Sequence, residues 1–140
     1  MLIRMLYVSK AAGPQTSTVT ARILATAQEQ NRLNNITGLL CQGQGLYLQV
    51  LEGERAAVNR LYARLLADTR HQDVQILHLE EIRQRRYPAW SMALISLSDD
   101  DPMLQLQHPE FDPYSAPGGV VMGMLEEMAA QGHRISGPTS

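Results

Sequence analysis

The segment LYLQVLEGE, residues 46–54, has the alternation of a β-strand that runs into a turn. Even-numbered residues point to one side of such a strand and odd-numbered residues to the other, because strand side chains alternate with period two. Both sides are mostly apolar, so the pattern predicts a strand that is buried on two faces. Gln49 is the exception. A buried amide without partners costs about 1–3 kcal/mol, so we expect Gln49 to be hydrogen-bonded.

The segments on either side of this strand predict an α+β fold. Apolar residues at helical spacing indicate two helices, and the QGQG sequence at residues 42–45 is typical of a hairpin turn. The predicted order is β-α-β-β-α-β-β, a ferredoxin-like sheet with both helices on one face. The expected strands are residues 2–8, 36–42, 46–53, 74–82 and 90–97, and the expected helices are residues 17–31 and 55–68.

The predicted core ends near Leu97 and is followed by a C-terminal helical extension. Residues 98–119 are acidic at first and then rich in proline, and the last predicted helix covers residues 120–131. We therefore expect a core domain at residues 1–97 and a linker with a helical cap at residues 98–140. The apolar side of the last helix either caps the free sheet face or binds a partner. This side consists of Val121, Met124, Leu125 and Met128.

The composition is that of a globular protein in a reducing compartment. The chain has 140 residues, of which 44% are hydrophobic and 19% charged, with a formal net charge of −2. This balance argues against binding to nucleic acid or to anionic membranes, and no apolar run approaches the roughly 20 residues that span a bilayer. A single cysteine, Cys41, excludes an internal disulfide framework and favours the cytoplasm. The four histidines lack metal-ligand spacing, so no metal site is expected.

Three neutral polar residues occupy positions that should be apolar. Tyr7 shares a strand face with Ile3 and Met5, and Asn31 continues the apolar stripe of the first helix. The first and third strands are the central pair of the predicted sheet, so Tyr7 and Gln49 should be neighbours, with Asn31 above them. One interpretation is an internal network in which Tyr7 bonds to Gln49 and Asn31 caps its helix. The other is a pocket for a flat heterocycle with alternating carbonyl and N–H groups.

Five segments of the chain match one known family in order and spacing. They are RMLYVSKA at residues 4–11, NITGLL at 35–40, LYLQVLEGE at 46–54, LYARLLADTRH at 61–71 and YPAWSM at 87–92. Over roughly residues 1–97 the chain resembles BLUF domains, the sensors of blue light that use flavin. The resemblance implies the ferredoxin-like fold, with FAD bound non-covalently between the two helices, and FMN or riboflavin as alternatives.

The resemblance also implies a role for individual residues. Tyr7 would be the electron donor, Gln49 would bridge it to the flavin, and Trp90 and Met92 would exchange places near Gln49 to carry the signal. Plain core packing is the alternative for Trp90 and Met92, and a surface ion pair is the alternative for Arg64 with Asp68. The implied flavin-binding residues are Tyr7, Ile23, Gln30, Asn31, Ile36, Gln49, Arg64, Asp68 and His71.

The function implied is that of a stand-alone blue-light photoreceptor. A light-driven rearrangement of the hydrogen bonds among tyrosine, glutamine and flavin would signal to a downstream protein, or would change self-association into a homo-oligomer. We expect no catalytic activity of the chain itself. The alternative is a light-insensitive ferredoxin-like module that binds a ligand or a partner. An acylphosphatase-type enzyme fits poorly, since no phosphate-binding loop lies near the N-terminus.

Overall fold

The structure is a computed structural model that describes residues 1–88, 92–96, 112–130 and 134–136. Its elements follow the predicted order, with one further strand at the end. They are β1 (Leu2–Ala11), α1 (Ser17–Leu33), β2 (Thr37–Gly43), β3 (Leu46–Glu54), α2 (Arg55–Leu66), β4 (His71–Ile82), β5 (Ala93–Ser96), α4 (Gly118–Ala130) and β6 (Arg134–Ser136).

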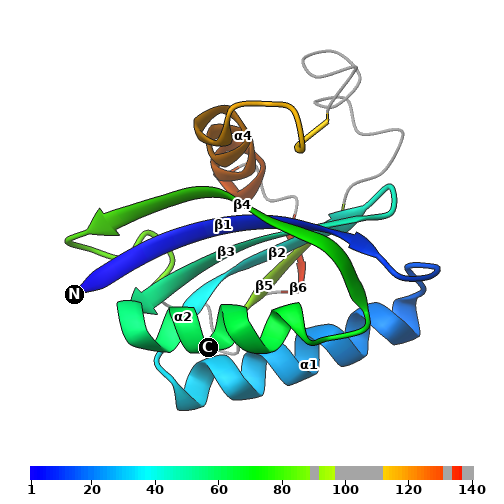
Figure 1. The fold of residues 1–140 in the computed structure, drawn as a ribbon, viewed down its shortest axis with the longest axis horizontal. Helices are drawn as coiled ribbons and strands as arrows, with labels where there is room; N and C mark the ends of the chain where they lie inside the picture. Colours follow the sequence, from blue (N-terminus) through cyan, green and yellow to red (C-terminus); the bar gives the residue numbers. More distant parts are fainter. Residues whose placement is uncertain (89–91, 97–111, 131–133, 137–140) are drawn as a thin grey trace.

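The strands form one sheet in the order β4-β1-β3-β2-β5-β6, which confirms that β1 and β3 are central neighbours. β3 is antiparallel to both β1 and β2, and β5 is parallel to β2. Helices α1 and α2 lie side by side on one face of the sheet, whereas α4 lies on the other face (Figure 1). The ferredoxin-like α+β prediction is therefore confirmed.

Local sequence signals explain where the first helix and the hairpin begin and end. Thr16 caps α1, because its side chain accepts a hydrogen bond from the backbone N–H of Val19 at 3.2 Å. Asn35 adopts a φ of 55° just after the helix, as expected for an asparagine at a helix end. Gln44 and Gly45 both have positive φ between β2 and β3, which is the conformation of a type I′ hairpin turn.

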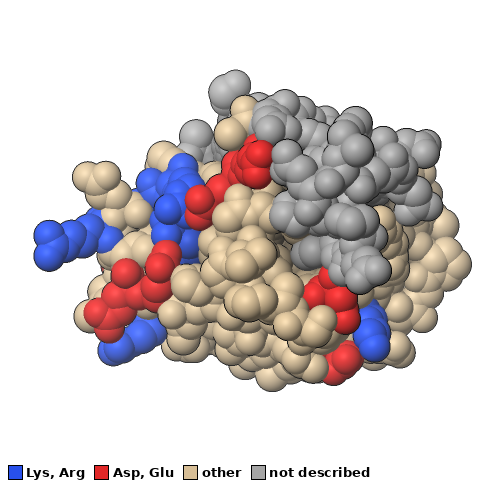
Figure 2. All heavy atoms as spheres, turned by 90° about the horizontal axis from the view of Figure 1, so that it is seen from above, with Lys and Arg blue, Asp and Glu red and all other residues tan. Residues whose placement is uncertain are grey.

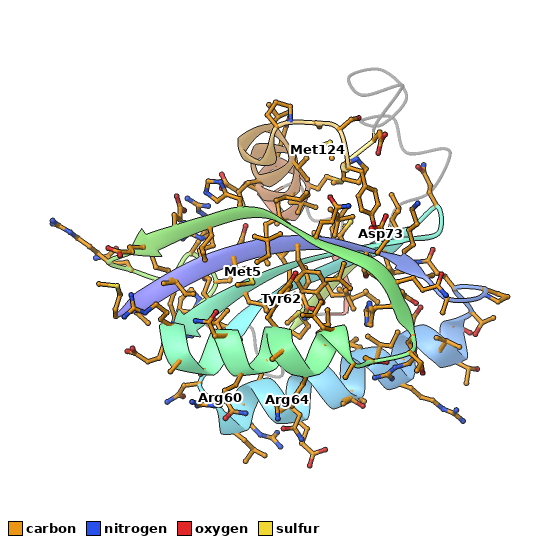
Figure 3. All side chains as sticks on the ribbon, viewed as in Figure 1. Met5, Arg60, Tyr62, Arg64, Asp73 and Met124 are labelled. Carbon is orange, nitrogen blue, oxygen red and sulfur yellow. The ribbon has the colours of Figure 1, made fainter. Side chains whose placement is uncertain are left out.

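Each face of the sheet has its own hydrophobic core. The core under α1 and α2 contains Met5, Tyr7 and Leu51, together with Ile23 and Val58 from the helices. Figure 3 shows Met5 and Tyr62 between the sheet and α2, and Met124 on the opposite side of the sheet. Successive side chains of the central strands thus point alternately into the two cores, as predicted.

The apolar side of α4 covers the second face. Val121, Leu125 and Met128 are fully buried and pack in one cluster with Leu6 and Val50 of the central strands. The capping interpretation of this helix is therefore correct for the described residues. Seen from this side, acidic and basic side chains lie next to one another towards the end of the molecule that carries the N-terminus (Figure 2).

Several boundary predictions need correction. Strand β1 extends to Ala11, β4 begins at His71 rather than at residue 74, and the two helices end at Leu33 and Leu66 rather than at residues 31 and 68. The fifth strand was expected over residues 90–97, whereas β5 is Ala93–Ser96, so Met92 lies just before the strand rather than within it. Trp90 lies outside the described residues. Strand β6 was not predicted, because three residues carry too little periodicity, and it extends the sheet by pairing with β5.

Truncation of Leu125 tests the docking of α4. We expect Leu125→Ala to lower the free energy of unfolding by about 2–5 kcal/mol, since a fully buried leucine leaves a cavity. Val120→Ala on the same helix is the matched control, because Val120 is 54% exposed and its truncation should change stability by at most about 0.5 kcal/mol. Urea unfolding followed by circular dichroism measures both. Equal stability of the two variants would show that α4 is not docked in solution.

Candidate functional site

Tyr7 and Gln49 are direct partners across the central strand pair. They stand opposite each other in the register of β1 and β3, and the Tyr7 hydroxyl donates a hydrogen bond to Gln49 Oε1. Tyr7 is fully buried and Gln49 is 5% exposed. The other end of the amide, Gln49 Nε2, donates to Met92 Sδ at 3.5 Å. Gln49 therefore has a different partner at each end of its amide.

Burial keeps the Tyr7 phenol protonated. The pKa of Tyr7 is raised well above its ordinary value, mainly because burial disfavours the phenolate, with a smaller contribution from the charge of Asp68. The Tyr62 ring of α2 meets Tyr7 edge to face, with the ring centroids 6.1 Å apart. The hydroxyl is thus a donor in an apolar environment, and Gln49 Oε1 accepts its hydrogen bond.

A cavity of about 290 Å³ lies next to this pair, and residues of both α1 and α2 line it. Gln49 forms part of its wall, as does Asn31, which is fully buried. The Asn31 backbone carbonyl accepts from Ile36 N at 2.8 Å where α1 ends. The residues around the cavity are Ile23, Thr26, Ala27, Gln30, Asn31, Gln49, Leu61, Arg64, Leu65, Asp68, Arg70 and His71.

Most of the residues predicted for the site meet at this cavity. Seven of them form its wall: Ile23, Gln30, Asn31, Gln49, Arg64, Asp68 and His71. Tyr7 and Ile36 belong to the hydrophobic core on the same face of the sheet, and Met92 reaches the site through Gln49. The internal network and the pocket were alternatives at first, but the Tyr7–Gln49 bond and the cavity occur together.

The charged residues of the cavity have different partners from those expected. Asp68 pairs with Arg70, whose Nη2 lies 2.7 Å from Asp68 Oδ2. The Arg70 hydrogen bonds lower the pKa of Asp68. The alternative interpretation of Arg64 and Asp68 as a surface ion pair is therefore wrong, because α2 ends at Leu66 and Asp68 no longer follows the helix. Arg64 Nη1 instead lies 3.5 Å from Gln30 Oε1 on α1.

His71 closes the cavity at the start of β4. Its Nδ1 lies 2.8 Å from Ser9 Oγ, and its ring packs on Tyr47 with the centroids 5.0 Å apart. The pKa of His71 is lowered, chiefly because burial disfavours the imidazolium. A neutral imidazole therefore stands here at neutral pH.

Five residues of the cavity wall were missed from the sequence. Four of them, on α1 and α2, lie three or four positions from residues that were found, so helical spacing could have identified them. Arg70 stands between Asp68 and His71 and carried no periodic signal. The missed residues are Thr26, Ala27, Leu61, Leu65 and Arg70.

The chemistry of the wall fits a flat, neutral heterocycle. Asn31 and Gln49 offer amide donors and acceptors, whereas Ile23, Leu61 and Leu65 are apolar. Among the described residues, no group of three or more histidine, cysteine or acidic side chains could hold a metal ion. No helix in the described part of the chain has the length and hydropathy to cross a membrane.

Comparisons with known proteins find relatives that are activated by light. Over 92 residues, or 65% of this chain, the sequence is 37% identical to the photoactivated adenylate cyclase subunit beta of Euglena gracilis. The chain spans 11% of that protein, so it matches a small part of its length.

Solved structures with a similar fold include light-regulated proteins. The photo-activated state of BlsA is 25% identical with a TM-score of 0.81, and covers 100% of this chain and 99% of that one. The dark state of BlrB, a BLUF protein, is 27% identical with a TM-score of 0.77, over 93% and 96% of the two chains. A bacterial light-regulated adenylyl cyclase is 30% identical with a TM-score of 0.70, over 94% of this chain and 36% of that one.

The sequence model of one family, sensors of blue light using FAD, matches residues 2–93, which include both partners of the buried tyrosine–glutamine pair and every residue of the cavity wall. The chain belongs to the BLUF family, and the cofactor of this family is FAD.

Proposed function

We propose that the protein is a blue-light photoreceptor in which the Tyr7–Gln49 pair starts the response. The observation that carries this proposal is the hydrogen bond from the Tyr7 hydroxyl to Gln49 Oε1, at the wall of a cavity between the two helices. Both groups are neutral, and both are removed from water. An amide whose two ends differ can change partners without moving a charge through the core.

The cavity wall offers distinct contacts for the cofactor. Asn31 and Gln49 would hold the polar edge of the flavin ring, and Ile23, with the neighbouring core residue Ile36, would pack on its faces. Gln30, Arg64, Asp68 and His71 would hold the ring edge and the ribityl chain. FAD is the family cofactor, and FMN and riboflavin would use the same ring contacts.

The photochemical step follows from the two neutral groups. When bound, a flavin would supply the absorption of blue light and, once excited, an acceptor for one electron. Tyr7 would donate the electron and, through the Gln49 amide, a proton. One electron and one proton would then return to Tyr7, so that its phenol is restored and the Gln49 amide is left rotated or tautomerised. The changed hydrogen bonds of Gln49 would shift the absorption to the red.

The output passes to a downstream protein or to a second copy of the chain. Residues 1–97 would sense the light, and residues 98–140 would form the linker and helical cap that carries the response. Trp90 and Met92 would exchange places near Gln49, and Met92 already contacts the amide. We infer that the chain works in the cytoplasm and catalyses no reaction itself.

Two substitutions test the pair directly. In Gln49→Leu and Tyr7→Phe we expect flavin to remain bound, but the light-induced red shift to be lost, because the amide or the proton donor is missing. Tyr62→Phe is the matched control, since it removes the hydroxyl of the aromatic neighbour of Tyr7 and should leave the shift in place. A flash-induced difference spectrum measures all three. A normal photocycle in both site variants would contradict the assigned roles.

A third substitution tests the binding site. Asn31→Ala should weaken flavin binding by about fivefold or more, because a buried amide that bonds the ligand contributes at least about 1 kcal/mol. Asn59→Ala on the exposed side of α2 is the control and should leave the affinity unchanged. Titration of the flavin-free protein with FAD measures the dissociation constants. Equal affinities of the two variants, or a wild-type protein that binds no flavin, would favour the light-insensitive module instead.

A further inference from the structure

Glu52 places a buried carboxylate on the face of β3 opposite to that of Gln49. It is fully buried and stands opposite Arg4 of β1 and Thr37 of β2. Gln49 faces α1 and α2. Glu52 lies three residues further on, so it points to the α4 side of the sheet. A buried charge is costly unless it is paired and hydrogen-bonded, so its partners indicate what it does.

The Glu52 carboxylate binds both a cation and the backbone of the segment between β4 and β5. Arg4 Nε donates to Glu52 Oε2 at 2.8 Å, and Arg4 Nη2 lies 2.7 Å from the same oxygen. The backbone N–H groups of Arg86 and Tyr87 donate to its two oxygens, at 2.9 Å to Oε2 and 2.8 Å to Oε1. Each oxygen of the carboxylate thus holds one backbone amide in place.

The same segment is tied to the β3 backbone as well. Arg85 Nη1 donates to the backbone carbonyl of Glu52 at 2.9 Å and to Thr37 Oγ1 at 3.0 Å. Each of residues 85, 86 and 87 therefore donates a hydrogen bond to the same residue of the central sheet, Glu52. This segment leads along the chain to Met92.

Met92 is fixed to the other face of the sheet, beside the cavity. It is fully buried, its sulfur accepts from Gln49 Nε2, and its backbone carbonyl accepts from Gln28 Nε2 at 3.0 Å. Strand β3 thus holds the segment twice, through Glu52 at residues 86 and 87 and through Gln49 at residue 92.

A carboxylate suits this position for a geometric reason. It has two acceptor oxygens and no donor, so it can accept from two backbone N–H groups and from Arg4 at the same time. An amide has one acceptor oxygen, and its NH₂ group would face a second donor. Stability alone does not explain the charge, since an apolar replacement of a buried ion pair is often as stable.

We propose that Glu52 is a positioning residue for the light response: by fixing the backbone of Arg86 and Tyr87, it sets the position of Met92 against the Gln49 amide. This inference rests on the proposed role of Gln49. Without the carboxylate, Met92 holds the amide less firmly, and the amide returns to its dark arrangement over a lower barrier.

The variant Glu52→Gln tests the inference with two readouts. Amide hydrogen exchange at residues 86 and 87, measured by NMR in the dark, should become faster by about tenfold, the factor that corresponds to one lost charged hydrogen bond. Dark recovery of the red-shifted absorption should also become faster by about tenfold. Glu80→Gln is the matched control, because it removes the other carboxylate paired with Arg4 and leaves the segment untouched. Both readouts should then stay within about twofold of the wild type.

The outcomes separate this inference from the proposed function. Faster exchange with dark recovery within about twofold of the wild type would overturn the positioning role and leave Glu52 as a purely structural residue. If Glu52→Gln does not fold, Glu52→Asp decides on the same criteria, because it keeps the charge beside Arg4 and withdraws the oxygens by one methylene. A wild-type protein without any red shift would overturn the proposed function itself, and this inference with it.

Discussion

The hydrogen bond between Tyr7 and Gln49 is the interaction on which the other features of the site depend. It joins the two central strands inside a core that excludes water, where an unpaired amide would cost about 1–3 kcal/mol. Both groups are neutral, and burial raises the pKa of Tyr7, so the proton stays on the phenol in the dark. A charged group here would hold its partners too firmly to exchange them.

The charged groups around this pair are held in ion pairs of their own. Asp68 and Arg70 pair with each other at the cavity wall, and Arg4 and Glu52 pair on the opposite face of the sheet. The alternation of β3 separates Glu52 from Gln49, because it directs a neutral amide to one face and a carboxylate to the other. The amide can rearrange, whereas the carboxylate holds the backbone of Arg86 and Tyr87.

Much of the fold and seven of the twelve residues of the cavity wall could be predicted from the sequence. Strand alternation was enough to make Tyr7 and Gln49 neighbours, and the helical stripe placed Asn31 beside them. These predictions depended on periodicities of two and 3.6, which tertiary packing did not override. The family resemblance supplied the remaining site residues that were found, including Gln30 and His71.

The failures occurred where the chain leaves regular structure. Arg64 and Asp68 have the spacing of a helical ion pair, but α2 ends between them, so Asp68 turns to Arg70. Glu52 is a polar residue on the otherwise apolar even-numbered face of β3. Gln49 is a polar residue on the odd-numbered face, so both residues are exceptions to the pattern. The following Gly53 and Glu54 made it resemble the start of a turn. Its partners, the backbone N–H groups of residues 86 and 87, have no signature in a sequence.

The relative size of two energies limits what light can do to α4. Burial of a large apolar side chain contributes about 1.5–3 kcal/mol, and α4 buries five such residues: Val121, Met122, Met124, Leu125 and Met128.

The docking of α4 is therefore worth on the order of 10 kcal/mol before its entropic cost. A rearranged hydrogen bond at Gln49 supplies only about 1–3 kcal/mol. Complete reversal of an equilibrium from 1:99 to 99:1 needs about 5.5 kcal/mol. The ion pair of Arg86 with Glu126, half-exposed at the edge of α4, adds little to this balance. Light should therefore shift how α4 packs on the sheet rather than release it, and a partner would have to recognise that change in packing.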